Sequence, residues 1–595
     1  MTKELLNTAP EWTMDDAYGS LTDERWTRSG ERLVTLTKTL AGLTVGRDTL
    51  REALTIYEEA VTIQSSMACF AKCLGAKDAT DAAAAAESDR LGVLGSELER
   101  AAAPLMEMLM SLEEDDSLWQ EKPFSHWRFV IRERCGNWHG RLTQTDAALV
   151  AAVETRNFLP LGNLHKSLQK LVDFEATNAA GEPVRIRAAK MVAVLKGDPD
   201  GALRRSVGEA MDGWYARHAD LYAGLLNQLH GIRLTCFERA GADPLEVSLA
   251  QNRMSRGALE AIRTAILRNV DWVRDGVRLR TKVLGGDVMG FYDVMAPAPE
   301  ASGGVARLMP YEEGIGIVKR ALGHVNPAMP AFIDMMLEHH WIDAKPSDKK
   351  VGGAFYSRFN EFRIPRVFST YLGSITSVMQ QGHELGHAFH YWTMRDLPMI
   401  ETEFPMTLTE TASTFNEAVI RRVLLDEAQG DERFKMLWQD MRSAGNFLLN
   451  TMVRMDFELQ FLEERRRGVV PATRCCEIMR EVWRRWYGDE VTPDVWLWAH
   501  KLHYYKTDQF IYNYPYTVGY VMSLALMREW EKRGDDFYDF YVKMLRDTGR
   551  MTVDEIIREH FGADATDPAF WEEAIGSVKR ATEEFRRLVE ARCSA

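Results

Sequence analysis

Long stretches of this 595-residue chain repeat their apolar residues every three or four positions. The pattern is clearest over residues 33–43, 50–63, 91–112 and 221–239. Side chains at this spacing lie on one face of an α-helix, which can then be buried against a neighbouring helix. Because the chain exceeds the size at which one hydrophobic core stops growing, several cores are expected. The sequence therefore predicts a mainly α fold.

A few short segments depart from the helical period. Residues 171–176 and 184–186 flank the turn-forming residues 178–181 and predict a β-hairpin. Residues 351–355 and 365–371 are expected to be strands of a small β-sheet. The segment APAPEASGG, residues 296–304, is the clearest loop, and a helix is expected to begin after it, near Pro310.

Charge and cysteine usage exclude several classes of protein. The net charge of -14 argues against a nucleic-acid partner and against binding to anionic membranes. The seven cysteines include no CxxC pair, which favours a reducing compartment. The first residues lack the apolar core of a signal peptide, and no stretch reaches the roughly 18 apolar residues of a membrane span. We therefore expect a cytoplasmic protein, with its oligomeric state unknown.

The segment HELGH places His383 and His387 four positions apart, with Glu384 beside them. On a helix this spacing puts both imidazoles on one face, where they can bind one zinc ion and leave positions for a third ligand and a water. Glu384 is then predicted to be the general base that deprotonates this zinc-bound water. The alternative is a helix with two ordinary histidines. Gly382 and Gly386 argue against it, because glycine inside a helix indicates close backbone approach.

A third metal ligand is expected from another helix. Glu410 in TLTETASTFNEAV is the predicted ligand, and Glu417, two turns later on the same face, is the substitute. Two prolines in the intervening segment allow the first helix to end and the chain to return. The alternative role for Glu410 is a capping box with Thr407. His390 is predicted to be a supporting or packing residue, because the metzincin extension would require glycine there and histidine in place of Thr393.

HELGHAFHYW followed by TLTETASTFNEAVI resembles the oligoendopeptidase F branch of the M3 zinc metallopeptidases, the family that also contains thimet oligopeptidase. The segment GGAFYSRF and the N-terminal pattern of Trp12, Asp15, Asp16 and Tyr18 also resemble this family, so the resemblance covers nearly the whole chain. It implies a division into an N-terminal helical domain, a linking domain and a zinc peptidase domain, expected at residues 1–112, 113–195 and 196–595.

The resemblance implies that His383, His387 and Glu410 bind one Zn²⁺ per chain. It also implies an ellipsoidal, multi-helix metallopeptidase fold with a deep central channel, which admits short peptides and excludes folded proteins. The expected strand at residues 352–355 would then bind an extended peptide through its main chain, with Gly353, Ala354 and Phe355 in contact with substrate. The alternative for this strand is a core strand with glycines at a bend.

Downstream, HKLHYYKTDQFIYNYPYTVGYVMS resembles the region from which the family supplies a histidine and tyrosines that stabilise the tetrahedral intermediate. His503, Tyr514 and Tyr520 are predicted for this role, and Tyr512 for substrate binding. The spacing between His503 and Tyr520 is longer than in the thimet-type pattern, so the choice among Tyr512, Tyr514 and Tyr516 stays open. The alternative for each tyrosine is an aromatic core.

These observations predict a zinc-dependent oligoendopeptidase that hydrolyses internal bonds of short peptides. Two alternatives stay open. One is a carboxypeptidase or dipeptidase on a related helical scaffold, which shares HExxH and a downstream glutamate. The other is a non-catalytic peptide-binding protein, which would have no need of an activated water.

Overall fold

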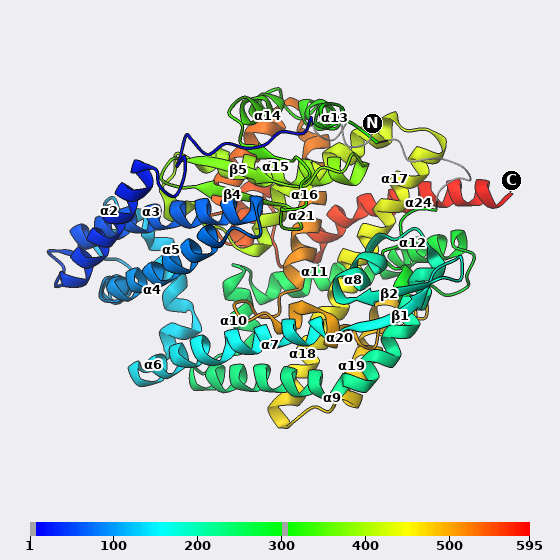
Figure 1. Cartoon of the computed structure of the whole chain (residues 1–595), viewed down its shortest axis with the longest axis horizontal. Helices are drawn as coiled ribbons and strands as arrows, with labels where there is room; N and C mark the ends of the chain where they lie inside the picture. Colours follow the sequence, from blue (N-terminus) through cyan, green and yellow to red (C-terminus); the bar gives the residue numbers. More distant parts are fainter. Residues whose placement is uncertain (1–7, 300–307, 595) are drawn as a thin grey trace. The chain divides into compact units, whose positions relative to one another are not determined.

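The computed structural model describes residues 8–299 and 308–594, and helices make up most of both of its compact units (Figure 1). Unit 1 contains residues 1–135, 305–423 and 526–561, and unit 2 contains residues 136–304, 424–525 and 562–595. The predicted mainly α fold with small sheets is confirmed. The three-way domain division stays a prediction. Part of the predicted loop at residues 296–304 lies outside the described residues.

Unit 1 is built from helices that pack in two groups. In the N-terminal group α3 packs against both α2 and α4, and in the second group α15 packs against α13, α14 and α22. The helices of this unit are α2 (Glu24–Gly42), α3 (Leu50–Lys77), α4 (Ala82–Met110), α5 (Phe124–Gly136), α13 (Tyr311–Gly323), α14 (Ala328–Glu338), α15 (Ile375–Met394), α16 (Met406–Glu427), α22 (Phe537–Asp547) and α23 (Val553–Ile556). The helix expected near Pro310 is α13, which begins one residue later.

A three-stranded sheet lies beside α15 in unit 1 (Figure 1). Its order is β3 (Ile342–Asp343), β5 (Ile364–Phe368), β4 (Phe355–Phe359), and β4 pairs antiparallel with β5. The strand predicted at residues 351–355 therefore begins only at Phe355. Gly353 has φ of +100°, a left-handed conformation that glycine adopts without strain and that interrupts an extended strand. In the part of the chain that is described, β4 is an edge strand.

The N-terminal segment is packed against this sheet. Trp12 lies against Phe368 of β5, with ring centroids 5.5 Å apart. The Trp341 Nε1–H donates to Asp16 Oδ2 at 2.6 Å, and the Tyr18 hydroxyl donates to Glu361 Oε2 at 2.5 Å. Trp12, Asp16 and Tyr18 thus anchor the N-terminal segment to the sheet beside α15.

Unit 2 is also helical, and its longest helix is α9, with 39 residues. Its helices are α6 (Gln144–Val153), α7 (Leu159–Lys170), α8 (Ala188–Gly197), α9 (Gly201–Arg239), α10 (Pro244–Gln251), α11 (Arg256–Arg268), α12 (Val270–Val283), α17 (Gly430–Ala444), α18 (Thr451–Arg467), α19 (Ala472–Tyr487), α20 (Leu497–His500) and α24 (Pro568–Ser594). Helix α21 (Tyr514–Arg533) begins in this unit and ends in unit 1.

The predicted hairpin of unit 2 is confirmed. It consists of β1 (Asp173–Thr177) and β2 (Pro183–Arg187), paired antiparallel across Gly181, whose φ is +80°.

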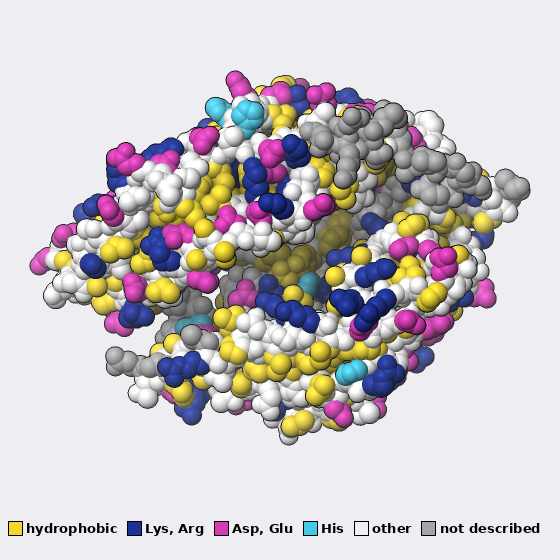
Figure 2. All heavy atoms as spheres, in the orientation of Figure 1, with side chains coloured by type: hydrophobic (Ala, Val, Ile, Leu, Met, Phe, Trp, Pro, Cys, Tyr) yellow, Lys and Arg dark blue, Asp and Glu magenta, His cyan; other side chains and the backbone are white. Residues whose placement is uncertain are grey.

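Figure 2 shows Lys and Arg side chains gathered over α8 and β2. No helix among the described residues is long and apolar enough to cross a membrane. All seven cysteines carry free thiols.

Candidate metal centre

Helix α15 carries the HELGH segment. Its first turn is capped by Ser374, whose hydroxyl accepts a hydrogen bond from the Ser377 N–H at 3.2 Å. The helix is buried against β4, β5, α13 and α22, so its orientation is set by packing on several sides. After α15 ends, the chain turns through the two prolines and returns as α16, as predicted.

Two glycines let α16 lie almost in contact with the backbone of α15. A Cβ added to Gly386 would lie 2.6 Å from the Cα of Ser413 and 2.7 Å from the carbonyl oxygen of Ala412. One turn earlier, the Gly382 carbonyl accepts a hydrogen bond from the Asn416 side-chain amide at 3.1 Å. The close approach predicted from these glycines is confirmed, and it brings Glu410 to the histidines.

His383, His387 and Glu410 point their polar atoms at one spot. The two Nε2 atoms are 3.2 Å apart, and Glu410 Oε2 lies 3.4 Å from His383 Nε2 and 3.6 Å from His387 Nε2. Tetrahedral zinc with bonds of about 2.0–2.1 Å places its ligand atoms about 3.3–3.4 Å apart. The triangle therefore has the size that a zinc ion requires.

Glu417 lies behind this triangle and does not join it. Its Oε1 is 2.6 Å from His383 Nδ1, and its Oε2 is 3.5 Å from an Arg421 guanidinium nitrogen. A histidine whose Nδ1–H donates a hydrogen bond to a carboxylate presents the Nε2 lone pair to a metal. The predicted substitute ligand is therefore placed as the residue that orients His383. The seven-residue spacing between Glu410 and Glu417 places both carboxylates on one helical face. The spacing alone does not determine which of them reaches His383 Nε2.

The carboxylates around His383 favour a positive charge at this position. Burial opposes protonation of His383, but the hydrogen bond to Glu417 and the charges of Glu417, Glu410 and Glu384 outweigh it and raise the pKa of His383 to about 9. Burial, with the nearby charge of His383, holds the pKa of His387 well below its usual range. Two facing imidazole nitrogens and a carboxylate oxygen in a negative environment form a donor set that fits a divalent cation.

Glu384 is buried beside the two histidines, with 6% of its surface exposed. Burial raises the pKa of Glu384 to about 7, and the positive charge of His383 partly opposes this rise. A carboxyl group with a pKa near neutrality can both accept and return a proton at ordinary pH.

The capping-box alternative for Glu410 is wrong. Helix α16 begins at Met406, so Thr407 and Glu410 both lie inside the helix. The Glu410 carboxylate accepts a hydrogen bond from the Ser413 hydroxyl at 2.8 Å, which holds it toward the histidines.

Strand β4 runs beside the metal triangle. The ring of Tyr356 lies against His387 with centroids 5.9 Å apart, a contact that the sequence reasoning missed although Tyr356 stands within the GGAFYSRF segment. Of the predicted substrate-binding residues, Phe355 opens β4, whereas Gly353 and Ala354 lie in the turn before it.

His390 lies on α15 but does not contribute to the triangle. Its Nε2 is 2.8 Å from the Thr548 hydroxyl, and its ring stacks on Phe404 with centroids 4.1 Å apart. At the end of α15, Arg546 donates to Asp396 at 2.6 Å. These contacts fix the end of α15 against the C-terminal end of α22.

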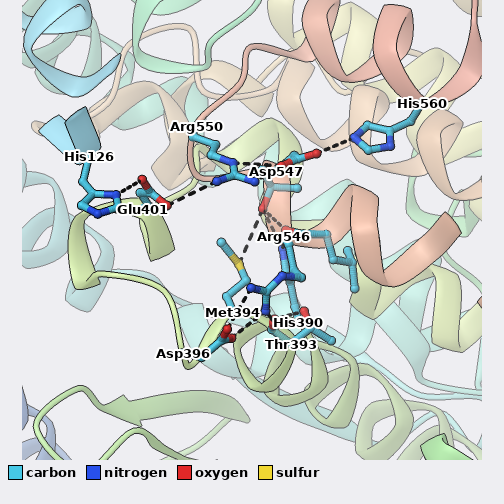
Figure 3. A network of polar contacts seen from close by, with 12 residues as sticks. His126, His390, Thr393, Met394, Asp396, Glu401, Arg546, Asp547, Arg550 and His560 are labelled. Atoms are coloured by element: carbon cyan, nitrogen blue, oxygen red, sulfur yellow. Dashed lines mark hydrogen bonds and ion pairs between the residues drawn. The ribbon is translucent and has the colours of Figure 1, made fainter. Parts of the chain in front are cut away.

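A chain of polar contacts joins four segments of unit 1 near this end of α15 (Figure 3). His126 of α5 is 2.7 Å from Glu401, and Glu401 is 3.6 Å from Arg550. Arg550 donates to Asp547 at 2.7 Å, and Asp547 is 2.9 Å from His560. These contacts therefore join segments that are far apart in the sequence, near the C-terminal end of α15.

The predicted oxyanion residues lie in unit 2, near the start of α21. His503 Nδ1 is 2.8 Å from Asn513 Oδ1, and the His503 ring packs against Tyr512 at 4.9 Å. Tyr520 stacks on Phe447 at 4.9 Å. Tyr514 is fully buried, and its hydroxyl donates to the Ser248 carbonyl at 3.0 Å.

Comparison with known proteins agrees with this geometry. The family model described as peptidase family M3 matches residues 329–577. The chain is 21% identical to oligopeptidase PepF of Bacillus subtilis (strain 168) over 602 aligned residues, which cover 97% of this chain and 87% of that protein. It is also 21% identical to an oligoendopeptidase F homolog of Lactococcus lactis over 69% of this chain and 68% of that protein. Oligoendopeptidase-F from Enterococcus faecium shares the fold, with a TM-score of 0.69, 17% identity and coverage of 96% of this chain and 98% of that one.

The buried HExxH helix, the crossing helix with its glutamate and these relatives define the class of this protein, a metalloendopeptidase. Residues 329–577 match peptidase family M3, and this matched segment contains His383, His387 and Glu410. The resemblance described from the sequence is confirmed.

Proposed function

We propose that this chain is a zinc-dependent oligoendopeptidase that hydrolyses internal bonds of short peptides. The observation that carries the proposal is the convergence of His383, His387 and Glu410 on one spot, with buried Glu384 beside them. The three triangle residues would hold one zinc ion per chain. When bound, zinc supplies Lewis acidity, which polarises a carbonyl group and lowers the pKa of a water.

The protein's own groups then manage the proton and the orientation of the site. Glu384 takes the proton of the attacking water on its carboxylate and returns it to the leaving amine, a role suited to a pKa near 7. Glu417 keeps a proton on His383 Nδ1, so that the Nε2 lone pair faces the metal position. Ser413 holds Glu410 in place.

The peptide is proposed to bind along β4. As an edge strand among the described residues, β4 can add an extended peptide as a further strand, and recognition through main-chain hydrogen bonds tolerates many side chains. Phe355 would contact the peptide from the strand, and Gly353 and Ala354 from the preceding turn. In unit 2, Tyr512 is proposed to bind substrate.

His503, Tyr514 and Tyr520 are proposed to stabilise the oxyanion. For Tyr514 this role requires its hydroxyl to leave the Ser248 carbonyl. For His503 it requires a proton on Nε2, because Nδ1 is engaged with Asn513 and burial lowers the pKa of His503 to about 2. We further propose a cytoplasmic setting, which the free thiols of all seven cysteines support.

The test compares the wild type with Glu384→Gln on a quenched fluorescent peptide, with zinc content measured on the same samples. We expect the variant to retain zinc and to lose activity by at least about 1,000-fold. Mass spectrometry of the wild-type products separates internal cleavage from stepwise trimming of the ends. Substantial activity in the zinc-loaded variant would refute the role of Glu384, and exclusively terminal cleavage would favour the carboxypeptidase or dipeptidase alternative.

A further inference from the structure

Strand β4 of unit 1 packs against two helices, and its successive side chains contact different ones. Tyr356 lies against His387 of α15, with ring centroids 5.9 Å apart. The residues on either side of it, Phe355 and Ser357, contact Lys72 of α3. Because successive side chains of a strand point to opposite faces, β4 has a metal face, which carries Tyr356, and an α3 face, which carries Phe355 and Ser357.

The side chain of Lys72 lies along the α3 face. Its ammonium nitrogen is 4.0 Å from the centroid of the Phe355 ring and 3.4 Å from Ser357 Oγ. Lys72 is an exposed residue, and among the described residues no carboxylate lies within ion-pair distance of its ammonium group. An aromatic ring attracts a cation but does not neutralise its charge. The ammonium group is therefore held against the strand with its charge uncompensated.

Lys350 provides the contrast on the same sheet. Its ammonium nitrogen is 4.3 Å from the centroid of the Phe368 ring of β5, and that ring stacks on Phe355 with centroids 4.9 Å apart. The charge of Lys350 is met by Asp343, whose carboxylate oxygen is 2.6 Å away. Two lysines thus lie over neighbouring rings, and in the part of the chain that is described Lys72 is the one without a carboxylate. At Lys72 the anion can come from a ligand.

A peptide added to the edge of β4 would place every second side chain on the α3 face. Directly opposite residues in a sheet have Cβ atoms about 4.5–5.5 Å apart. Since the ammonium nitrogen of Lys72 is 3.4 Å from Ser357 Oγ, an acidic side chain opposite Ser357 or Phe355 can reach it. The main chain of the peptide, with its terminal carboxylate, follows the edge of the sheet and not this face. The geometry therefore favours a side-chain carboxylate.

We propose that Lys72 is a specificity-determining residue that binds the carboxylate of an Asp or Glu side chain of the peptide substrate. This inference rests on the proposed peptidase function and on the addition of the peptide to β4. The metal face then receives the bond that is cleaved, and Lys72 selects peptides that carry an acidic residue on the α3 face. Because side chains alternate, the preference is confined to one position of the peptide or to positions two residues apart.

Binding is measured in the zinc-loaded Glu384→Gln variant by isothermal titration calorimetry, so that cleavage does not consume the peptide. Peptides of one length carry a single Glu in place of Gln at each position in turn, and both ends are blocked so that only the side chain differs in charge. We expect Glu to tighten binding by about 5-fold at one position or at positions two apart, the size of an exposed ion pair, and Lys72→Met to abolish this gain. Raising the NaCl concentration from about 0.05 M to about 0.5 M should reduce the gain through screening.

Matched variants separate the charge of Lys72 from its packing. Lys72→Met retains an unbranched apolar side chain over Phe355, whereas Lys72→Arg keeps the charge and should keep the gain. Lys77→Met is the control on the same helix and should leave the gain unchanged, because Lys77 is also exposed but its ammonium nitrogen is 3.4 Å from a Glu11 carboxylate oxygen.

Three results would overturn the role of Lys72. They are equal binding of Glu and Gln peptides at every position, a gain that survives Lys72→Met, and gains of equal size at adjacent positions, which would contradict the alternation of a strand. If the gain depends on Lys72 but the wild type cleaves no peptide, the proposed function fails and Lys72 stands as a carboxylate-binding residue.

Discussion

Replacing Gly386 by alanine would place a Cβ 2.6 Å from the Cα of Ser413. Ordinary contact begins at 3.4 Å, so α16 would have to retreat by about 0.8 Å. Glu410 is held by Ser413 at 2.8 Å and would move with it. Metal–ligand distances tolerate only about 0.2 Å. The methyl group should therefore impair the zinc site as well as packing.

We expect Gly386→Ala to lose about 1–3 kcal/mol of folding stability and about 100-fold in peptide cleavage, with weaker zinc binding. Stability is measured by urea unfolding, and zinc affinity by competition with a chelating dye. Gly316 on α13 is the matched control, because a Cβ there would meet nothing within 4 Å. Gly316→Ala should be neutral or stabilising by up to about 1 kcal/mol, with zinc affinity unchanged. Zinc affinity in Gly386→Ala within twofold of the wild type would refute the proposed helix crossing.

Three further predictions follow from particular contacts. Glu417→Gln should weaken zinc binding by about 10–100-fold, because it removes the carboxylate that orients His383; unchanged affinity in the dye competition would contradict this. Burial lowers the pKa of His230 to about 3, so its contribution to stability is present above pH 6.5 and lost as the pH falls toward 3. His230→Gln should therefore reduce the fall in unfolding free energy between pH 7 and pH 5 by about 2 kcal/mol, measured by urea titration, whereas an unchanged slope would show that His230 is not buried and neutral. Cys135 and Cys593 are exposed and the other five cysteines are buried, so a thiol reagent should modify two thiols per chain rapidly; five or more would contradict the fold.

The sequence allowed the metal triangle to be predicted because its geometry is mostly local. His383 and His387 lie on one helical face whatever surrounds them. The glycines beside them indicated that the backbone of another segment approaches closely. The position of Glu417 on His383 Nδ1 could not be derived in this way. It depends on how α16 crosses α15, which is set by packing between residues more than 25 positions apart.

The start of strand β4 and the choice of packing partners also could not be derived from local sequence patterns. Strands were expected at residues 351–355 and 365–371, but the left-handed Gly353 places the start of β4 at Phe355. Nothing local in the sequence pairs Trp12 with Phe368, although this contact anchors the N-terminal segment to the sheet. Each compact unit combines three separate stretches of chain, and helical periodicity contains no information on which helices become partners.

The central claim is that His383, His387 and Glu410 bind zinc together. Zinc K-edge X-ray absorption of the zinc-loaded chain tests it most directly, with His387→Ala as the comparison. We predict two imidazole nitrogens and oxygen ligands at about 2.0–2.1 Å in the wild type, and the loss of one imidazole in the variant. Sulfur ligands at about 2.3 Å, or an identical spectrum for His387→Ala, would contradict it.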